Sequence, residues 1–92
     1  MNIKKYQQKQ EGRITVEFYL KAKDGAFPCE VTIDEDNGRY TIRKADTSGE
    51  FFDTPQELVK WIMDNWRSDY FQDEEQFQQM IKEIQVYIPV NE

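Results

Sequence analysis

The sequence predicts an α+β domain in which an antiparallel three-stranded meander precedes two α-helices packed on one face of the sheet. Apolar and polar residues alternate along the first half, which is the period of a half-buried strand. In the second half apolar residues recur every three to four positions, as on an amphipathic helix. Charge divides at the same place. Residues 1–45 carry nine Lys/Arg and seven Asp/Glu, a net +2, whereas residues 46–92 carry three and eleven, a net −8. We therefore expect an acidic helical side.

Three strands are predicted, over about residues 13–20, 27–34 and 39–45. Their alternation would leave one face of the sheet buried and the other wet. The inward residues are Ile14, Val16, Phe18, Leu20, Phe27, Cys29, Val31, Ile33, Tyr40 and Ile42. After the third strand, Phe51 and Phe52 form either a short fourth strand or a plug beneath the helices.

A tight hairpin is predicted between the second and third strands. Asn37 and Gly38 mark its turn, because Asn-Gly readily adopts positive φ. A four-residue loop would place two pairs of opposite charges across the strands on the outer face, where they help modestly. The pairs are Asp34 with Arg39 and Glu30 with Arg43. A two-residue loop is the competing register.

The first predicted helix covers about residues 55–67, and its start is the strongest local pattern in the chain. Thr54 suits the N-cap, Pro55 the first helical position, and Glu57 lies three residues after the cap. At 100° per residue, the apolar side chains span about 200° of the helix, roughly twice what a surface helix usually buries. They are Leu58, Val59, Trp61, Ile62, Met63 and Trp66. This helix therefore needs two neighbours.

The second predicted helix covers about residues 73–86. Asp73 suits its N-cap, and Glu74 and Glu75 follow in the first turn, where negative charge is favourable. Its apolar arc is about 100° wide, so one neighbour is enough. The arc contains Phe77, Met80, Ile81 and Ile84. A helix pair on one face of the sheet satisfies both helices.

Ninety-two residues suffice for one domain with one core. We expect a flexible polar arm over residues 1–11, in which a short strand around Ile3 is the alternative, and a single α+β domain over 12–92. The sequence has no apolar run long enough for a membrane span or a secretory signal, and Cys29 alone cannot form an intramolecular disulfide. These features predict a cytoplasmic protein, and its size and style suggest a bacterial one. A net charge of −6 disfavours nucleic acids and anionic membranes as partners.

The sequence offers no constellation for catalysis or cofactor binding. It has no histidine, which removes the commonest general base and most zinc sites. Ser48 and Ser68 lie in loop sequence with no base nearby. Cys29 falls on the inward face of a strand, where a small buried hydrophobe is expected. The acidic hairpin at residues 34–38 lacks the ligand spacing of a calcium loop. We therefore expect no enzyme activity, no cofactor and no metal site.

The remaining candidates for function are aromatic residues on the acidic side. Trp61 lies at the edge of the first helix's apolar arc, and Tyr70 and Phe71 lie in the connector between the helices. Trp and Tyr are enriched in interface hot spots, and the acidic residues Asp64 and Asp69 accompany them. We therefore predict a non-enzymatic protein-interaction or regulatory domain that contacts a protein partner of basic character through these five residues.

Three alternatives remain open. A homodimer could form through the open sheet edge or the rim of the first helix. An acidic decoy would occupy the nucleic-acid-binding site of another protein, and it needs regularly spaced exposed carboxylates. A small-ligand-binding protein, or an enzyme that uses carboxylates alone, ranks lowest, because it needs a pocket lined with polar groups between sheet and helices.

Overall fold

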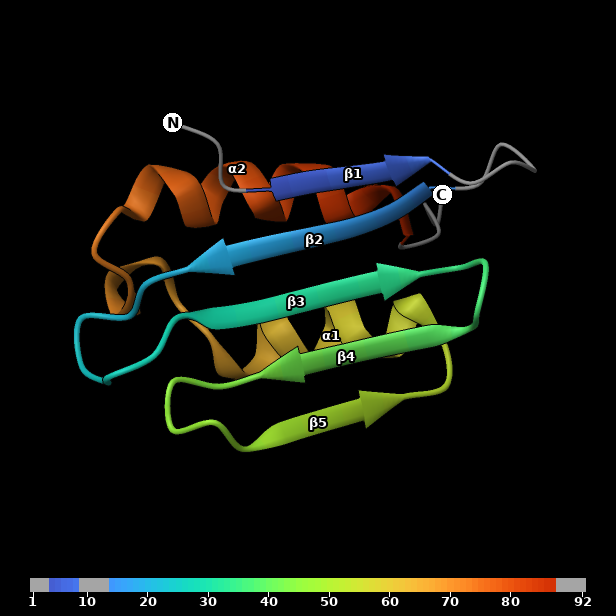
Figure 1. Ribbon diagram of the computed structural model, residues 1–92. Helices are drawn as coiled ribbons and strands as arrows, with labels where there is room; N and C mark the ends of the chain where they lie inside the picture. The colour runs from blue at the N-terminus through green and yellow to red at the C-terminus, as the bar shows by residue number, and fades with distance from the viewer. Residues whose placement is uncertain (1–3, 9–13, 88–92) are drawn as a thin grey trace.

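Within residues 4–8 and 14–87, which the computed structural model describes, five antiparallel strands form one sheet and two α-helices lie against one of its faces (Figure 1). The strands are β1 (Lys4–Gln8), β2 (Ile14–Leu20), β3 (Cys29–Asp34), β4 (Arg39–Arg43) and β5 (Gly49–Phe52). The helical elements are α1 (Pro55–Asn65), α2 (Glu74–Ile84) and the 3-10 turns η1 (Ser68–Tyr70) and η2 (Gln85–Tyr87). The strands lie side by side in chain order, so the sheet is an up-and-down meander.

The predicted class, an antiparallel meander followed by two helices, is confirmed, but the predicted count of three strands is wrong. The three predicted strands form the centre of the sheet, and one further strand lies at each edge. β5 contains Phe51 and Phe52, so the fourth-strand alternative is correct. β1 lies within residues 1–11, for which the sequence predicts a polar arm. Its sequence, KKYQQ, has little apolar pattern, and backbone pairing with β2 makes it a strand. The rest of that segment lies outside the described residues.

Of the two registers that the sequence left open for the β3–β4 hairpin, the structure has the four-residue loop. Asp34 pairs with Arg39 and Glu30 pairs with Arg43, and the Arg43 guanidinium lies 3.7 Å from the Glu30 carboxylate. Inside the loop, the backbone N–H and the side-chain amide of Asn37 both donate to the Asp34 carboxylate, at 3.2 and 2.9 Å. This register keeps the apolar residues of both strands on the helical face.

β3 begins at Cys29 rather than at about residue 27, because the preceding loop extends further than the alternation predicts. Gly25 adopts a positive φ of 129° in this loop. Pro28 has no N–H to donate to a ladder. Phe27, which is predicted to point inward, is therefore exposed.

β4 ends at Arg43 rather than at about residue 45, because a tight hairpin leads into β5. The Lys44 N–H donates to the Ser48 C=O at 2.7 Å, and the Thr47 N–H donates to the Lys44 C=O at 2.8 Å. Thr47 has a positive φ of 70°. This combination is typical of a three-residue hairpin loop with one residue in the left-handed region.

α1 starts as predicted and ends early. The Thr54 hydroxyl accepts the Glu57 N–H at 3.1 Å, and the Glu57 carboxylate accepts the Asp53 N–H at 3.2 Å. This is a capping box in which the glutamate reaches the residue before the cap. The helix ends at Asn65 rather than at residue 67, because Trp66 takes an extended conformation and its ring is buried.

α2 also begins at its predicted cap. The Asp73 carboxylate accepts the N–H groups of Glu75 and Gln76, at 3.1 and 3.2 Å. The helix ends at Ile84, and the last predicted residues, 85 and 86, belong to η2. In the described part of the chain no helix is long and apolar enough to cross a membrane. Each α-helix has eleven residues, against about 20 for a span.

The core lies between the sheet and the helices. α1 contacts β4 and β5, whereas α2 contacts β2, so the helices divide the inner face between them (Figure 1). The fully buried aliphatic and aromatic residues are Phe18, Leu20, Val31, Ile33, Ile42, Leu58, Val59, Ile62, Phe71, Met80 and Ile84. The wide arc predicted for α1 is only partly covered, because Trp61 is half-buried and Met63 is 48% exposed. No described element covers the opposite face of the sheet.

Candidate functional site

The connector between α1 and α2, residues 66–73, lies across one end of the sheet and is held there by backbone pairing. The Lys23 N–H donates to the Tyr70 C=O at 2.8 Å, and the Gln72 N–H donates to the Lys21 C=O at 2.9 Å. These bonds enclose an isolated antiparallel bridge between the connector and the β2–β3 loop. The conformation of the connector is therefore set by the fold.

A row of aromatic rings, the aromatic row, links β5 to α2 through the connector. Its members are Phe52, Trp61, Trp66, Phe71 and Phe77. Successive ring centroids are 6.4, 5.5, 5.3 and 5.0 Å apart. Pairs with this geometry contribute about 0.5–1.5 kcal/mol each beyond the area they bury. Trp66 and Phe71 are buried, so the row forms a firm wall at this end of the core.

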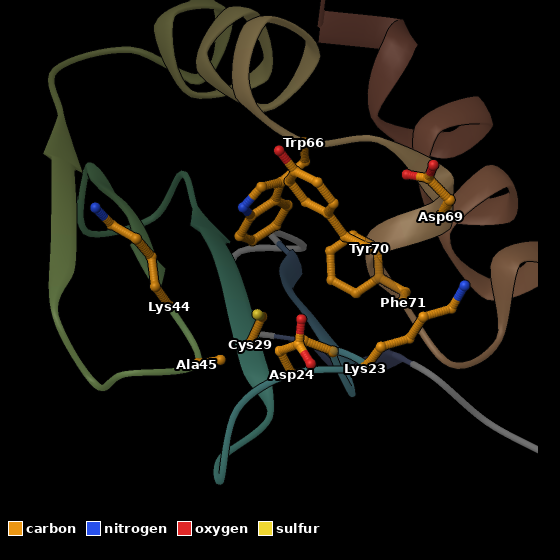
Figure 2. A pocket seen from close by; sticks show the side chains of 10 residues that line it. Lys23, Asp24, Cys29, Lys44, Ala45, Trp66, Asp69, Tyr70 and Phe71 are labelled. Atoms are coloured by element: carbon orange, nitrogen blue, oxygen red, sulfur yellow. The ribbon is translucent and has the colours of Figure 1, made fainter.

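A pocket of about 310 Å³ opens beside this wall, and we name it the end pocket (Figure 2). Its lining residues are Ala22, Lys23, Asp24, Cys29, Lys44, Ala45, Trp66, Asp69, Tyr70 and Phe71. Figure 2 shows the rings of Trp66 and Tyr70 on one side, with Cys29 and Ala45 across from them. Tyr70 is 47% exposed, so one aromatic side chain of the lining is presented to solvent.

A shallower hollow of about 520 Å³ adjoins the end pocket and shares Asp24, Lys44 and Ala45 with it. The β2–β3 loop supplies much of the remaining lining, including the exposed side chain of Phe27. The pocket and the hollow together form one concave surface with an aromatic side chain on either part.

The lining of the end pocket carries charges of both signs: Lys23, Asp24, Lys44 and Asp69. The Lys44 ammonium lies 2.8 Å from the Glu50 carboxylate and 5.6 Å from the centroid of the Trp61 ring. The hydrogen bond to Glu50 raises the pKa of Lys44. The Lys23 ammonium lies 3.9 Å from the Glu74 carboxylate. The side chains of both pairs are about one-third or more exposed, and pairs of this kind add little stability.

Cys29 contributes the one thiol of the lining, and it is buried. Burial raises the pKa of this thiol, which keeps it protonated and weakly nucleophilic near neutral pH. Among the described residues, no group of three or more His, Cys, Asp or Glu side chains is arranged to hold a metal ion.

Three of the five predicted contact residues line the end pocket: Asp69, Tyr70 and Phe71. Trp61 does not line it, and its half-buried ring packs edge-on against the next ring of the aromatic row. Asp64 lies on the exposed side of α1, where its carboxylate is 3.1 Å from the ammonium of a lysine on the same helix. The predicted contact surface on α1 and the end pocket are thus neighbouring surfaces, and Trp66 lies between them.

Several carboxylates of the acidic helical side bond within the chain. Glu57 and Asp73 cap the two helices. The Asp69 carboxylate lies 3.8 Å from the Arg67 guanidinium. A part of the −8 charge of the second half therefore serves helix ends and local ion pairs.

Sequence reasoning missed Lys44, Trp66 and the β2–β3 loop as parts of the site. The loop is recognisable as a turn from Lys23-Asp24-Gly25, but nothing in that pattern indicates what docks on it. The position of Trp66 could have indicated a role at the end of the first helix, because it is the last apolar residue before the polar Arg67-Ser68-Asp69 segment.

No family model matches this chain, and no curated protein or solved structure matches it. The side chains themselves are therefore the basis for inferring function. The end pocket offers an aromatic wall for apolar groups and charges of both signs for polar ones.

Proposed function

We propose that the protein is a non-enzymatic, cytoplasmic protein-interaction domain that takes an apolar side chain of a partner protein into the end pocket. The observation that carries this proposal is the position of Tyr70, which is 47% exposed on a pocket walled by Trp66 and Phe71. Aromatic residues in pockets that lose water on binding are the usual energetic centres of interfaces.

Preorganisation supports this function. The connector is tied to the β2–β3 loop by two backbone hydrogen bonds, and Phe71 stacks on Phe77 with ring centroids 5.0 Å apart. A pocket that is already formed avoids much of the ordering cost of association. The adjoining hollow would receive the residues next to the inserted side chain. An extended segment of the partner fits this pair of depressions best.

The charges of the pocket refine the kind of partner. A purely acidic rim would favour a basic protein, but the lining has two lysines and two aspartates: Lys23, Lys44, Asp24 and Asp69. We therefore propose a partner segment that places polar groups of both kinds around an apolar side chain.

A second candidate is a protein that binds a small organic molecule. The pocket volume of about 310 Å³ favours it, since ligand pockets typically begin near ~300 Å³. The aromatic wall and the polar residues around it would suit a single-ring ligand. The two candidates share the site and differ in what fills it.

Affinity capture from the native host with three baits separates these candidates. The baits are the wild type, Tyr70→Ala and the control Met63→Ala, which removes an equally exposed apolar side chain from α1 (48%). The true partner is retained by wild type and Met63→Ala and lost by Tyr70→Ala. With the purified partner, Tyr70→Ala should weaken binding about tenfold or more.

Two results would count against the interaction function. One is a captured protein that Tyr70→Ala retains as well as the wild type does. The other is that no protein is enriched, while amide resonances of Ala22 and Phe71 shift on adding a small-metabolite mixture. That second result favours the small-ligand candidate.

A further inference from the structure

β5 presents a bare sheet edge with an exposed aromatic residue. It is the last strand of the sheet, and no described element lies beyond it (Figure 1). Phe51 is 82% exposed there, on the face away from the helices. Natural proteins usually protect such edges with a very short strand, charged side chains (lysine above all), proline, a bulge or a covering element. β5, with the sequence GEFF, contains neither lysine nor proline.

The ladder between β4 and β5 fixes which backbone groups face outward. The Lys44 N–H donates to the Ser48 C=O. Hydrogen-bonded pairs alternate with non-bonded pairs along an antiparallel ladder. When this alternation is counted along β5 from Ser48, the backbone N–H and C=O groups of Glu50 and Phe52 point toward β4. The N–H and C=O of Phe51 therefore point to the free edge.

We propose that β5 pairs antiparallel with β5 of a second copy of this chain, with the two-fold axis at Phe51. In an antiparallel pair, directly opposed residues have their side chains on the same face of the sheet. A two-fold axis midway between two residues would oppose residues of different faces, so the axis must pass through a residue position. With the axis at Phe51, the two Phe51 residues exchange both N–H···O=C bonds and their rings lie side by side. With the axis at Glu50, two carboxylates stand directly opposite, which is destabilising.

Charge complementarity supports this register and identifies the occupant as a second copy. The axis at Phe51 places Asp53 of the second copy opposite Gly49, whose neighbour on β4 is Arg43. The Arg43 and Asp53 backbones are then two strand spacings apart, about 10 Å. Gly49 has no side chain to block the Arg43 guanidinium from reaching across. Two-fold symmetry forms this contact twice.

The paired edges are short, so the dimer is expected to be weak. β5 has four residues, and a stable interface usually buries at least ~1,200 Å². Sedimentation of the full chain over a wide concentration series should therefore show a reversible monomer–dimer equilibrium. This surface is separate from the end pocket, and the equilibrium is measured without any other protein.

Two matched lysine substitutions test the edge. Phe51→Lys places two ammonium groups face to face and should lower the association constant at least tenfold. Val86→Lys changes another highly exposed apolar residue (78%), in η2, and should leave it unchanged. Circular dichroism should show both variants folded, because both side chains lie in solvent. A chain that stays monomeric at every concentration, or a dimer that Phe51→Lys leaves intact, overturns the proposal.

Disulfide trapping tests the register. With oxidised glutathione, Phe51→Cys should link to its own copy, because directly opposed residues meet the Cα separation that a disulfide needs, below about 7 Å. Glu50→Cys should stay unlinked, because the two copies of residue 50 are then two residues out of register. Cys29 is buried and does not interfere. Linking at residue 50 rather than at residue 51 overturns the register.

Discussion

The indoles of Trp61 and Trp66 meet edge to face, with ring centroids 5.5 Å apart and an interplanar angle of 80°. Trp61 belongs to α1, and Trp66 is the first residue beyond it. Trp66 then packs at 5.3 Å against Phe71. A single buried indole thus joins the end of the helix, the connector and the wall of the end pocket.

Replacing Trp66 with alanine should therefore strongly destabilise the protein. Truncating a buried aromatic side chain leaves a cavity, and the free energy of unfolding should fall by about 3 kcal/mol or more. Urea unfolding followed by circular dichroism measures this. Tyr70→Ala is the control, because that side chain is half exposed and its loss should cost well under half as much. Equal losses in the two variants would show that the aromatic row does not hold the connector.

Gly25 should be far less replaceable than Gly38, although both have positive φ, 129° and 64°. A Cβ on Gly25 would lie 2.5 Å from the Cβ of Ala45, whereas one on Gly38 would meet nothing within 4 Å. Gly38→Ala should cost about 1–2 kcal/mol from backbone strain alone. Gly25→Ala should cost a further ~1–3 kcal/mol from overpacking.

The double variant Gly25→Ala, Ala45→Gly is the control for this steric explanation, because it removes the clashing methyl group. It should be more stable in thermal unfolding than Gly25→Ala alone. If it is not, the cost at Gly25 comes from the backbone and not from the contact with Ala45.

The parts of the fold that the sequence predicted are those that neighbouring residues determine. The opposite charges at 30 and 43 and at 34 and 39 belong to one of the two hairpin registers that the sequence left open, and that register is the one found. Thr54 and Asp73 marked both helix starts, because a side-chain cap acts within three residues. The pairing of β1 with β2 was not predicted, because KKYQQ becomes a strand through that pairing and its own pattern does not indicate a partner.

The end pocket could be predicted only in part, for a related reason. Tyr70 and Phe71 were candidates because a connector with two aromatic residues is conspicuous in the sequence. The pocket forms when the connector docks on the β2–β3 loop, beside the residues that follow β4. That contact joins segments far apart in the sequence, since Lys44 lies 21 residues and Tyr70 47 residues after Lys23, and no local pattern encodes it.

Asp46 should titrate at a lower pH than an ordinary aspartate. The Ser48 hydroxyl and the Ser48 backbone N–H both donate to its carboxylate and lower its pKa. The lowered pKa stabilises the fold above the ordinary aspartate value, about 3.9. This contribution is lost as the pH falls through the lower native pKa. Carboxyl NMR titration measures the value directly.

Ser48→Ala tests whether the Ser48 hydroxyl lowers the pKa of Asp46. It removes the hydroxyl and keeps the backbone N–H, so the pKa of Asp46 should rise part of the way to its ordinary value. Thr47→Ala is the neighbouring control, because the Thr47 hydroxyl donates to the Asp46 carbonyl and not to its carboxylate. A pKa that moves equally in both variants would mean that the Ser48 hydroxyl is not responsible.

The Cys29 thiol should react slowly in the native protein. Burial raises its pKa, so less of the nucleophilic thiolate is present at pH 7.5 than for a free cysteine with a pKa near ~8.5. Alkylation by iodoacetamide, followed by mass spectrometry, should be at least tenfold slower in buffer than in urea. The raised pKa also has a stability consequence. The stability that the raised pKa contributes is complete below the pKa of Cys29 in the unfolded state and is lost as the pH rises through its pKa in the native state. The free energy of unfolding should therefore fall at alkaline pH.

Variants of the end pocket show whether the pocket controls access to this thiol. Tyr70→Ala removes an exposed ring from the lining and should accelerate native alkylation of Cys29. Met63→Ala removes a similarly exposed side chain from α1 and should not. If Tyr70→Ala reacts at the wild-type rate, the Tyr70 ring does not limit access of the reagent to Cys29.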